Sequence, residues 1–250
     1  MTLKKPYPEV AAHRGAMLEA PQNTIPAYLR AAELGADMIE LDARVTGDLQ
    51  IVVVHDSTVD GFTNGSGKVS DLTLDEIRRL DAGVRFGEAF KGTRIPTLRE
   101  ALEFIKGRRM EVNVEIKDAP VEAVVSLVEE MGMEEQTMVS SPDGELLREA
   151  KQMCPRLTTM IMGLRPGNVE LLIERFEPDA VNFNRYTLNE ESYQAACSAG
   201  VLVYQSILGP NDNEAGALRA VELGAHILET DHTAEILDFL YRAGLRPNPK

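Results

Sequence analysis

From residue 96 to the end of the chain, short apolar segments with β-strand character alternate with longer amphipathic segments of helical periodicity. Such an alternation predicts a parallel sheet with helices packed on its outside. The number of repeats in a chain of 250 residues favours a closed (β/α)8 TIM barrel over an open doubly wound sheet. The expected strands are 111–116, 137–140, 157–162, 180–183, 201–205 and 226–229, and the expected helices are 98–105, 121–131, 144–153, 169–176, 188–199, 214–223 and 234–243.

The first part of the chain follows the same pattern less regularly. Strands are expected at 10–12, 37–41 and 51–54, and the helix between the first two ends at Gly35. The chain then has nine candidate strands, one more than the barrel needs, and residues 43–50 are few for a parallel crossover helix. Either an irregular loop makes this crossover, or one short strand lies outside the barrel.

Residues 56–95 interrupt the alternation after the third expected strand. Glycines punctuate this segment, and its one amphipathic helix, near residues 73–80, begins with a possible capping box of Thr73 and Glu76. Long structureless loops are uncommon, so we interpret the segment as a small insertion over one end of the barrel. Residues 1–250 are expected to form a single domain.

Three of the expected strands place charged or ionisable side chains where a buried strand would not normally have them. Side chains alternate along a strand, so Glu40 and Asp42 share one face, as do Glu115 and Lys117, and His55 ends the short strand at 51–54. Burying unpaired charge is expensive, so such groups are paired, metal-bound or catalytic.

The C-terminal ends of the strands form the face where barrel active sites lie. Three carboxylates gathered there repel one another and raise their pKa values unless a cation lies among them, and oxygen ligands favour Mg²⁺ or Ca²⁺ over zinc. Histidines supply a general acid and base near neutral pH, and Arg and Lys side chains suit a phosphate. The residues expected at this end are His13, Arg14, Glu40, Asp42, His55, Glu115 and Lys117. Together they indicate phosphoryl-ester chemistry.

Several separate motifs recur in one order along the chain. They are H-R-G at 13–15, P-x-N-T at 21–24, E-L-D at 40–42, H-D at 55–56, T-N-G-S-G-K-V-S-D-L-T at 63–73, I-P-T-L-R-E-A-L at 95–102, E-I-K at 115–117 and T-D at 230–231. In these motifs the sequence resembles glycerophosphodiester phosphodiesterases, densely through residue 117 and thinly afterwards. Agreement in order and spacing across many motifs makes the resemblance specific.

The resemblance implies a TIM barrel with one Ca²⁺ or Mg²⁺ that hydrolyses glycerophosphodiesters to glycerol 3-phosphate and an alcohol. Carried over by motif, the metal ligands would be Glu40, Asp42 and Glu115, the acid/base pair His13 and His55, and the phosphate-binding cations Arg14 and Lys117. In the route that the family implies, one histidine assists attack of a glycerol hydroxyl on phosphorus and the other protonates the leaving alkoxide. Water then opens the cyclic phosphate.

Some positions depart from the family pattern. Gln22 stands where Glu is common, Gly61-Phe62 replaces a frequent Arg-Thr, and Glu229 stands where an apolar residue is usual. The chain has no Trp, so the late W-T-V-N motif is absent. These changes concern the wall around the substrate, so a lysophospholipid or a sugar phosphodiester is an alternative substrate.

Structural interpretations of the same residues are also open. The acids of the second strand could pair with Arg14 or Arg44, and Lys117 could simply pair with Glu115 or Asp118. A non-catalytic phosphate-binding barrel is the alternative from another functional class. It would need a lost catalytic residue, whereas every expected one is present.

Charge and composition limit the partners and the location. The formal net charge of −14 argues against a nucleic-acid backbone or an anionic membrane surface as the main partner, and leaves a small-molecule substrate. Neither a signal-peptide apolar region nor a run of transmembrane length is visible, so a cytoplasmic location without stable membrane insertion is expected. Cys154 and Cys197 are expected to be reduced and buried. The oligomeric state is not specified by the sequence.

Overall fold

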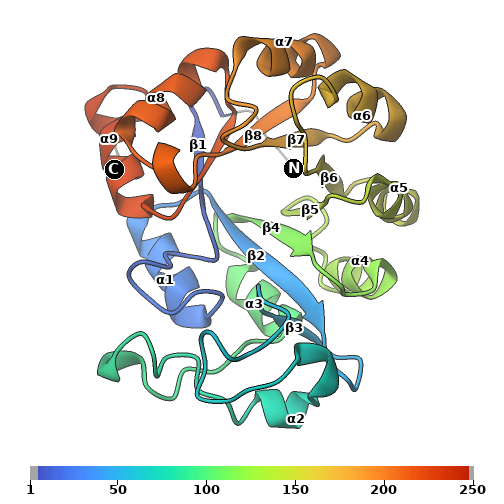
Figure 1. Ribbon diagram of the computed structural model, residues 1–250, viewed down its shortest axis with the longest axis vertical. Helices are drawn as coiled ribbons and strands as arrows, with labels where there is room; N and C mark the ends of the chain where they lie inside the picture. Colours follow the sequence, from blue (N-terminus) through green and yellow to red (C-terminus); the bar gives the residue numbers. More distant parts are fainter. Residues whose placement is uncertain (1–4, 248–250) are drawn as a thin grey trace.

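A computed structural model describes residues 5–247. Eight parallel strands close into a TIM barrel in the order β1, β2, β4, β5, β6, β7, β8, β9 and back to β1, with α4 to α9 arranged around them (Figure 1). The strands are β1 Glu9–Ala12, β2 Met38–Val45, β3 Ile51–Val53, β4 Glu111–Ile116, β5 Thr137–Ser141, β6 Thr158–Ile161, β7 Ala180–Phe183, β8 Leu202–Ser206 and β9 Ile227–Thr230. The helices are α1 Ile25–Leu34, α2 Leu74–Ile77, α3 Leu98–Ile105, α4 Val121–Glu130, α5 Gly144–Met153, α6 Val169–Phe176, α7 Glu190–Ala199, α8 Glu214–Leu223 and α9 Thr233–Arg242, with short 3-10 segments η1 Val69–Asp71, η2 Glu88–Phe90 and η3 Gly209–Asn211. The predicted fold class is confirmed.

The ninth strand, β3, lies outside the barrel. It pairs antiparallel with the end of β2, where Val45 is opposite Ile51, and a turn over residues 46–50 joins the two strands. An antiparallel neighbour can follow through such a short turn, whereas a parallel one cannot. Of the two alternatives left open for the extra strand, an irregular crossover loop is therefore wrong. Strand β2 is also longer than the predicted 37–41, because its second half pairs with both β3 and β4.

The core has two layers that follow the alternation of side chains along the strands. Outward-facing residues such as Leu41 and Val114 pack against the surrounding helices in the largest hydrophobic cluster. Inward-facing residues fill the barrel interior in a smaller cluster, which includes Met38, Met160 and Tyr204. Above this apolar plug, toward the C-terminal ends of the strands, the inward positions become polar.

Residues 56–95 form a unit with its own small core at one side of the barrel, around α2 (Figure 1). Val52 and Val54 of the β3 segment contribute to this core together with Ile77 and Ile95, so β3 joins the insertion to β2. The capping box of Thr73 and Glu76 is present. The helix that follows has only the single turn of α2, because tighter i→i−3 hydrogen bonds replace the helical ones from the Arg79 N–H onward.

The two cysteines differ in exposure. Cys154 is buried and Cys197 is exposed, so the expectation of burial was wrong for Cys197. That residue follows the buried Ala196 on α7 and falls on the solvent side of the helix. Within residues 5–247, no helix is both long and apolar enough to cross a membrane.

Candidate active site

Three carboxylates from two neighbouring strands meet inside the C-terminal end of the barrel. Strands β2 and β4 pair in parallel, so that Glu40 is opposite Asn113 and Asp42 is opposite Glu115. One ligand oxygen from each of Glu40, Asp42 and Glu115 lies within 4.8 Å of the others. Glu40 and Asp42 are buried, with 2% and 1% of their surface exposed. The alternation of the two strands therefore aims all three acids at one point, as the sequence predicts.

Burial and the neighbouring charges shift the pKa values of these three carboxylates. Burial raises the pKa of Glu40 well above its usual value, and repulsion from Asp42, Glu229 and Glu115 raises it further. Burial also raises the pKa of Glu115, although the Lys117 ammonium opposes it. The pKa of Asp42 is lowered, because Lys117 and Arg14 outweigh the effect of its burial. A cation between the acids would favour the ionised form of all three.

The donor atoms of this cluster fit a hard divalent cation. Asp42 Oδ1 is buried without a hydrogen bond, although Lys117 Nζ lies 3.1 Å away, and its other oxygen accepts from Asn23 Nδ2 at 2.7 Å. The side-chain oxygen of Asn113, the residue opposite Glu40, is also buried without a hydrogen-bond partner. Both oxygens are therefore available to a ligand, and unpaired buried oxygens also occur away from the cluster, as in Thr137 and Ser192. An all-oxygen set suits Ca²⁺ or Mg²⁺.

Two imidazoles border the carboxylates from different elements. His13 follows β1, and its Nε2 lies 4.0 Å from Glu40 Oε2. Its other nitrogen, Nδ1, is 2.7 Å from Asp231 Oδ1, in the loop after β9. His55 follows β3 and is partly exposed; its Nδ1 is 2.8 Å from Asp56 Oδ1. The charge of His55 contributes to the lowered pKa of Asp42, so His55 also lies near the cluster.

Two cations also reach the cluster. The Arg14 backbone N–H donates to Glu40 Oε2 at 3.0 Å, and its guanidinium Nε lies 3.6 Å from Asp42 Oδ2. Lys117 Nζ lies 2.5 Å from Glu115 Oε1. The expected ion pairs of Arg14 and Lys117 therefore exist, and they lie within the site.

The other expected ion pairs are arranged differently. Arg44 donates to the backbone carbonyl of His55 at 2.8 and 2.9 Å and pairs with Asp118 at 2.5 Å. It therefore supports the His55 segment and does not pair with the acids of β2. Asp118, in turn, binds Arg44 and not Lys117.

Four supporting residues were quoted in sequence motifs but were given no role there. Asp231 and Asp56 bind the ring nitrogens of the two histidines, Asn23 binds Asp42, and Gln22 accepts from Arg14 Nη1 at 2.7 Å. Burial would raise the pKa of Asp231, but the hydrogen bond and charge of His13 lower it. Their positions inside the T-D, H-D and P-x-N-T motifs were the signal that could have identified them.

A fourth buried acid lies beneath the cluster. Glu229 of β9 accepts from Tyr204 Oη at 2.9 Å and from Ser206 Oγ, both on β8. It replaces the apolar residue expected from the family pattern, and these two hydroxyls explain how the barrel interior accommodates it. Asn182 of β7 extends the row by donating to Ser206 Oγ at 3.2 Å.

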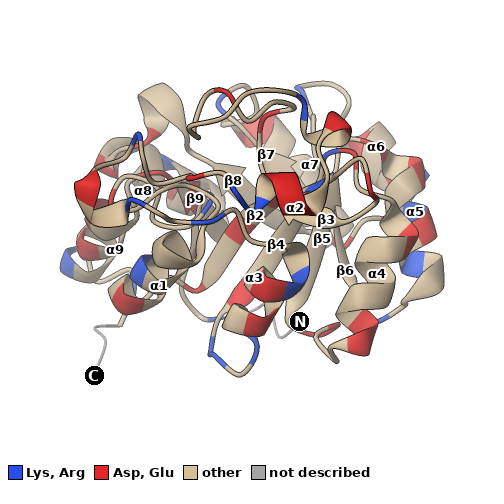
Figure 2. Ribbon diagram, turned by 90° about the horizontal axis from the view of Figure 1, so that it is seen from below, with Lys and Arg blue, Asp and Glu red and all other residues tan. Residues whose placement is uncertain are grey.

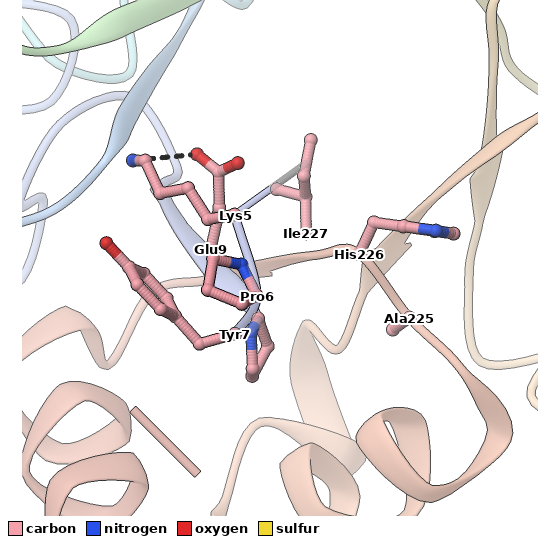
Figure 3. A pocket seen from close by; sticks show the side chains of 8 residues that line it. Lys5, Pro6, Tyr7, Glu9, Ala225, His226 and Ile227 are labelled. Atoms are coloured by element: carbon pink, nitrogen blue, oxygen red, sulfur yellow. Dashed lines mark ion pairs between the residues drawn. The ribbon is translucent and has the colours of Figure 1, made fainter. Parts of the chain in front are cut away.

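A cavity at the other end of the barrel is not part of this site. It has a volume of about 210 Å³ and is lined by Lys5, Tyr7, Glu9 and His226, at the N-terminal ends of β1 and β9 (Figure 3). The His226 Nδ1 accepts from the backbone N–H of Val203 at 3.0 Å. Chemistry in this fold belongs to the C-terminal ends of the strands, so we assign this cavity no catalytic role.

Comparisons with known proteins agree with this geometry. The profile of the glycerophosphoryl diester phosphodiesterase family matches residues 13–162. A glycerophosphodiester phosphodiesterase from Caldanaerobacter subterraneus is 37% identical over 94% of this chain and 98% of its own length. The crystal structure of a glycerophosphodiester phosphodiesterase from Agrobacterium tumefaciens aligns with a TM-score of 0.83 and 28% identity, covering 92% of this chain and 99% of that one. An Oleispira antarctica phosphodiesterase, solved in complex with the product sn-glycerol-3-phosphate, aligns with a TM-score of 0.86 and 25% identity over 94% of this chain and 97% of its own. The chain belongs to the glycerophosphoryl diester phosphodiesterase family, whose members are phosphoric diester hydrolases.

Proposed function

We propose that this protein is a metal-dependent phosphodiesterase that releases glycerol 3-phosphate and an alcohol from glycerophosphodiesters, with His13 and His55 as the acid/base pair. The observation that supports this most directly is the meeting of Glu40, Asp42 and Glu115 at one point beside His13. The product complex of the Oleispira antarctica phosphodiesterase, which has the same fold, supports the choice of substrate class.

Glu40, Asp42 and Glu115 would hold one Ca²⁺ or Mg²⁺ ion. The raised pKa values of Glu40 and Glu115 support this assignment, because a bound cation would favour their ionised forms. Bound there, the cation would act as a Lewis acid toward phosphoryl oxygens.

His13 and His55 would move the protons of the reaction. In each ring, Nδ1 is held by a carboxylate, from Asp231 or Asp56, and this leaves Nε2 for the substrate. One imidazole would remove the proton of the attacking hydroxyl, and the other would protonate the leaving alkoxide. A hydrogen-bonded carboxylate fixes the orientation of each ring, as the Asp of a catalytic triad does.

Arg14 and Lys117 would bind and neutralise the phosphate oxygens. Arg14 Nε is buried and makes no hydrogen bond, so one guanidinium donor is unused in the described structure. Lys117 lies between Asp42 and Glu115, which hold its ammonium at the cluster. Charge-assisted donors of this kind stabilise the negative charge that develops on phosphorus oxygens.

Product release from defined substrates tests the proposal. The purified chain, supplied with Mg²⁺ or Ca²⁺, is expected to release glycerol 3-phosphate from at least one of glycerophosphocholine, -ethanolamine, -inositol and -glycerol. Release of glycerol 3-phosphate with and without EDTA tests the metal requirement on a substrate that contains the attacking glycerol hydroxyl. Binding without turnover of any of these diesters would contradict the proposal and support a non-catalytic barrel.

A further inference from the structure

Three side chains form a cationic and aromatic group on the far rim of the barrel mouth. Arg165 lies in the loop after β6, and Arg185 and Tyr186 lie in the loop after β7, so all three are at the C-terminal ends of their strands. Arg185 Nη2 donates to Tyr186 Oη at 2.9 Å, and its guanidinium carbon lies 4.9 Å from the centre of the Tyr186 ring. The three side chains are exposed. We call them the β6–β7 rim group.

The rim group is on the same side of the barrel plug as the carboxylate cluster. Asn182 of β7 points inward and is linked through Ser206 to Glu229, beneath the cluster. Arg185 follows Asn182 by three residues, so it lies up to about 10 Å further toward the mouth. Its Nη1 would be only 3.9 Å from a Cβ at Gly209, so the guanidinium reaches the loop after β8.

The charges of the rim group are not neutralised by the protein. Among residues 5–247, neither Arg165 nor Arg185 forms an ion pair with a carboxylate, although the chain carries a formal net charge of −14. Both guanidinium groups act instead on Tyr186, whose pKa is lowered first by its hydrogen bond and proximity to Arg185 and then by Arg165. Two unpaired guanidinium groups and a phenol are ready donors for an anion.

We propose that the β6–β7 rim group binds the alcohol part of the substrate and favours head groups that carry a phosphomonoester of their own. This inference rests on the proposed function, which places the scissile phosphate at the cluster on the β1, β2 and β4 side. A head group that crosses the mouth from there would meet the loops after β6 and β7. A phosphomonoester has three acceptor oxygens and close to two negative charges, which match two guanidinium groups and a hydroxyl better than a carboxylate does.

The same geometry disfavours a quaternary ammonium head group such as choline. Such cations are recognised by open aromatic faces. Arg185 already lies against the ring of Tyr186, and a second arginine is close by. A choline head group there would therefore meet two like charges and an occupied ring.

A matched pair of substrates tests the proposal. Glycerophosphoinositol 4-phosphate and glycerophosphoinositol share the scissile diester and differ only in the extra phosphomonoester. We expect kcat/KM of the wild type to be about tenfold higher for the phosphorylated diester, mainly through KM, since one charge-assisted contact is worth about that factor. Arg185→Gln should bring the ratio close to one by lowering kcat/KM for the phosphorylated diester about tenfold, with a much smaller loss for glycerophosphoinositol. Arg109→Gln, an exposed arginine before β4 at the opposite end of the barrel, is the matched control and should leave the ratio unchanged.

The outcomes separate this proposal from the proposed function. Equal kcat/KM for the two diesters in the wild type, or an equal loss for both in Arg185→Gln, would overturn the head-group assignment while hydrolysis itself stands. Failure to hydrolyse either diester would overturn both proposals. Inorganic phosphate, added as a competitor, should lower the rate for the phosphorylated diester more than for the other if the subsite recognises phosphate. An equal effect on both would count against it.

Discussion

Both ends of the barrel contain buried acids, and the two groups of acids differ in their cationic partners. At the N-terminal end, Asp37 accepts from Lys5 Nζ at 2.7 Å and from the backbone N–H of Val10 at 2.8 Å, and it pairs with Arg246. Lys5 also pairs with Glu9 (Figure 3). At the C-terminal end, Arg14 and Lys117 are, among residues 5–247, the only Arg or Lys side chains that pair with the three acids. Asp42 Oδ1 is buried there without a hydrogen bond, and so are Glu9 Oε2 and Glu111 Oε2 at the N-terminal end.

The two ends therefore differ most in the role that we propose for their acids, which is structural at the N-terminal end and functional at the C-terminal end. Acidic residues are also spread over the outer helices, where many pair with Arg (Figure 2). Breaking a buried pair leaves an uncompensated charge and reduces stability. Removing an under-compensated acid from the other end should instead change ligand binding and activity. Four experiments test this difference.

Metal removal should have the largest effect. Treatment with EDTA is expected to reduce release of glycerol 3-phosphate from glycerophosphodiesters at least about a hundredfold, because Lewis-acid stabilisation contributes several kcal/mol. Added Mg²⁺ or Ca²⁺ should restore the rate, and calorimetric titration should show one site that is lost in Asp42→Asn. A full rate in EDTA, with no metal detected in the sample, would remove the metal from the proposal.

Loss of either imidazole should be nearly as severe. His13→Ala and His55→Ala are each expected to lower kcat by about 10²- to 10⁴-fold, the usual contribution of acid/base catalysis. Metal affinity should be retained, because neither imidazole is a proposed ligand. His226→Asn, at the opposite end of the barrel, is the matched control and should keep the wild-type kcat. A wild-type rate in either alanine variant would refute the acid/base role of that residue.

Substitution of a paired acid at the N-terminal end of the barrel should lower stability and leave the catalytic rate unchanged. Asp37→Asn removes a carboxylate that is 5% exposed and is expected to lower the free energy of unfolding by about 3 kcal/mol, because Arg246 loses its partner. Urea denaturation measures this change. The value of kcat/KM per folded molecule should be that of the wild type. A catalytic loss without a stability change would show that the two ends are not separable in this way.

Glu111, also at the N-terminal end of the barrel, has no paired cation among residues 5–247. Its substitution should give the smallest of the four effects. Burial, with repulsion from Glu9, raises its pKa from 4.5 to about 7. The folded protein therefore binds more protons than the unfolded chain between these values, and stability from this group, present below pH 4.5, is lost as the pH rises to 7.

Substitution of Glu111 tests this sign. Glu111→Gln should be more stable than the wild type at pH 8, by on the order of 2 kcal/mol, and nearly equal to it at pH 4.5. Thermal unfolding across this pH range measures the difference, with Glu122→Gln on the outside of α4 as a control. A variant that is less stable at pH 8 would show that the Glu111 carboxylate is favourably paired.

Much of this architecture could be predicted from local patterns. The alternation of apolar segments fixed the barrel class, and the alternation within β2 and β4 predicted that Glu40, Asp42 and Glu115 converge. Arrangements that depend on distant partners could not be predicted in this way. The pairing of His13 with Asp231 joins the first strand to the last, and no local pattern specifies such a contact. The bond of Arg44 to the His55 carbonyl depends on β3 turning back along β2.

Two parts of the interpretation stay predictions. The variants described above test the roles of His13, His55 and Asp42, and the roles of Glu40, Glu115, Arg14 and Lys117 stay predictions. The domain organisation, a single unit over residues 1–250 with an insertion at 56–95, awaits a test such as limited proteolysis, which should cut the insertion before the barrel.

The antiparallel placement of β3 has a mechanical consequence. His13 is anchored to the wall of the barrel, but His55 is attached to a side unit whose small core includes Val52 and Val54 and which joins the barrel mainly along the edge of β2. The two proposed proton carriers are therefore held differently, although Val53 packs in the main core and Arg44 of β2 bonds to the His55 carbonyl. Any shift of the side unit along that edge would change the distance between the two imidazoles. A diester that contacts both imidazoles has to fit that distance.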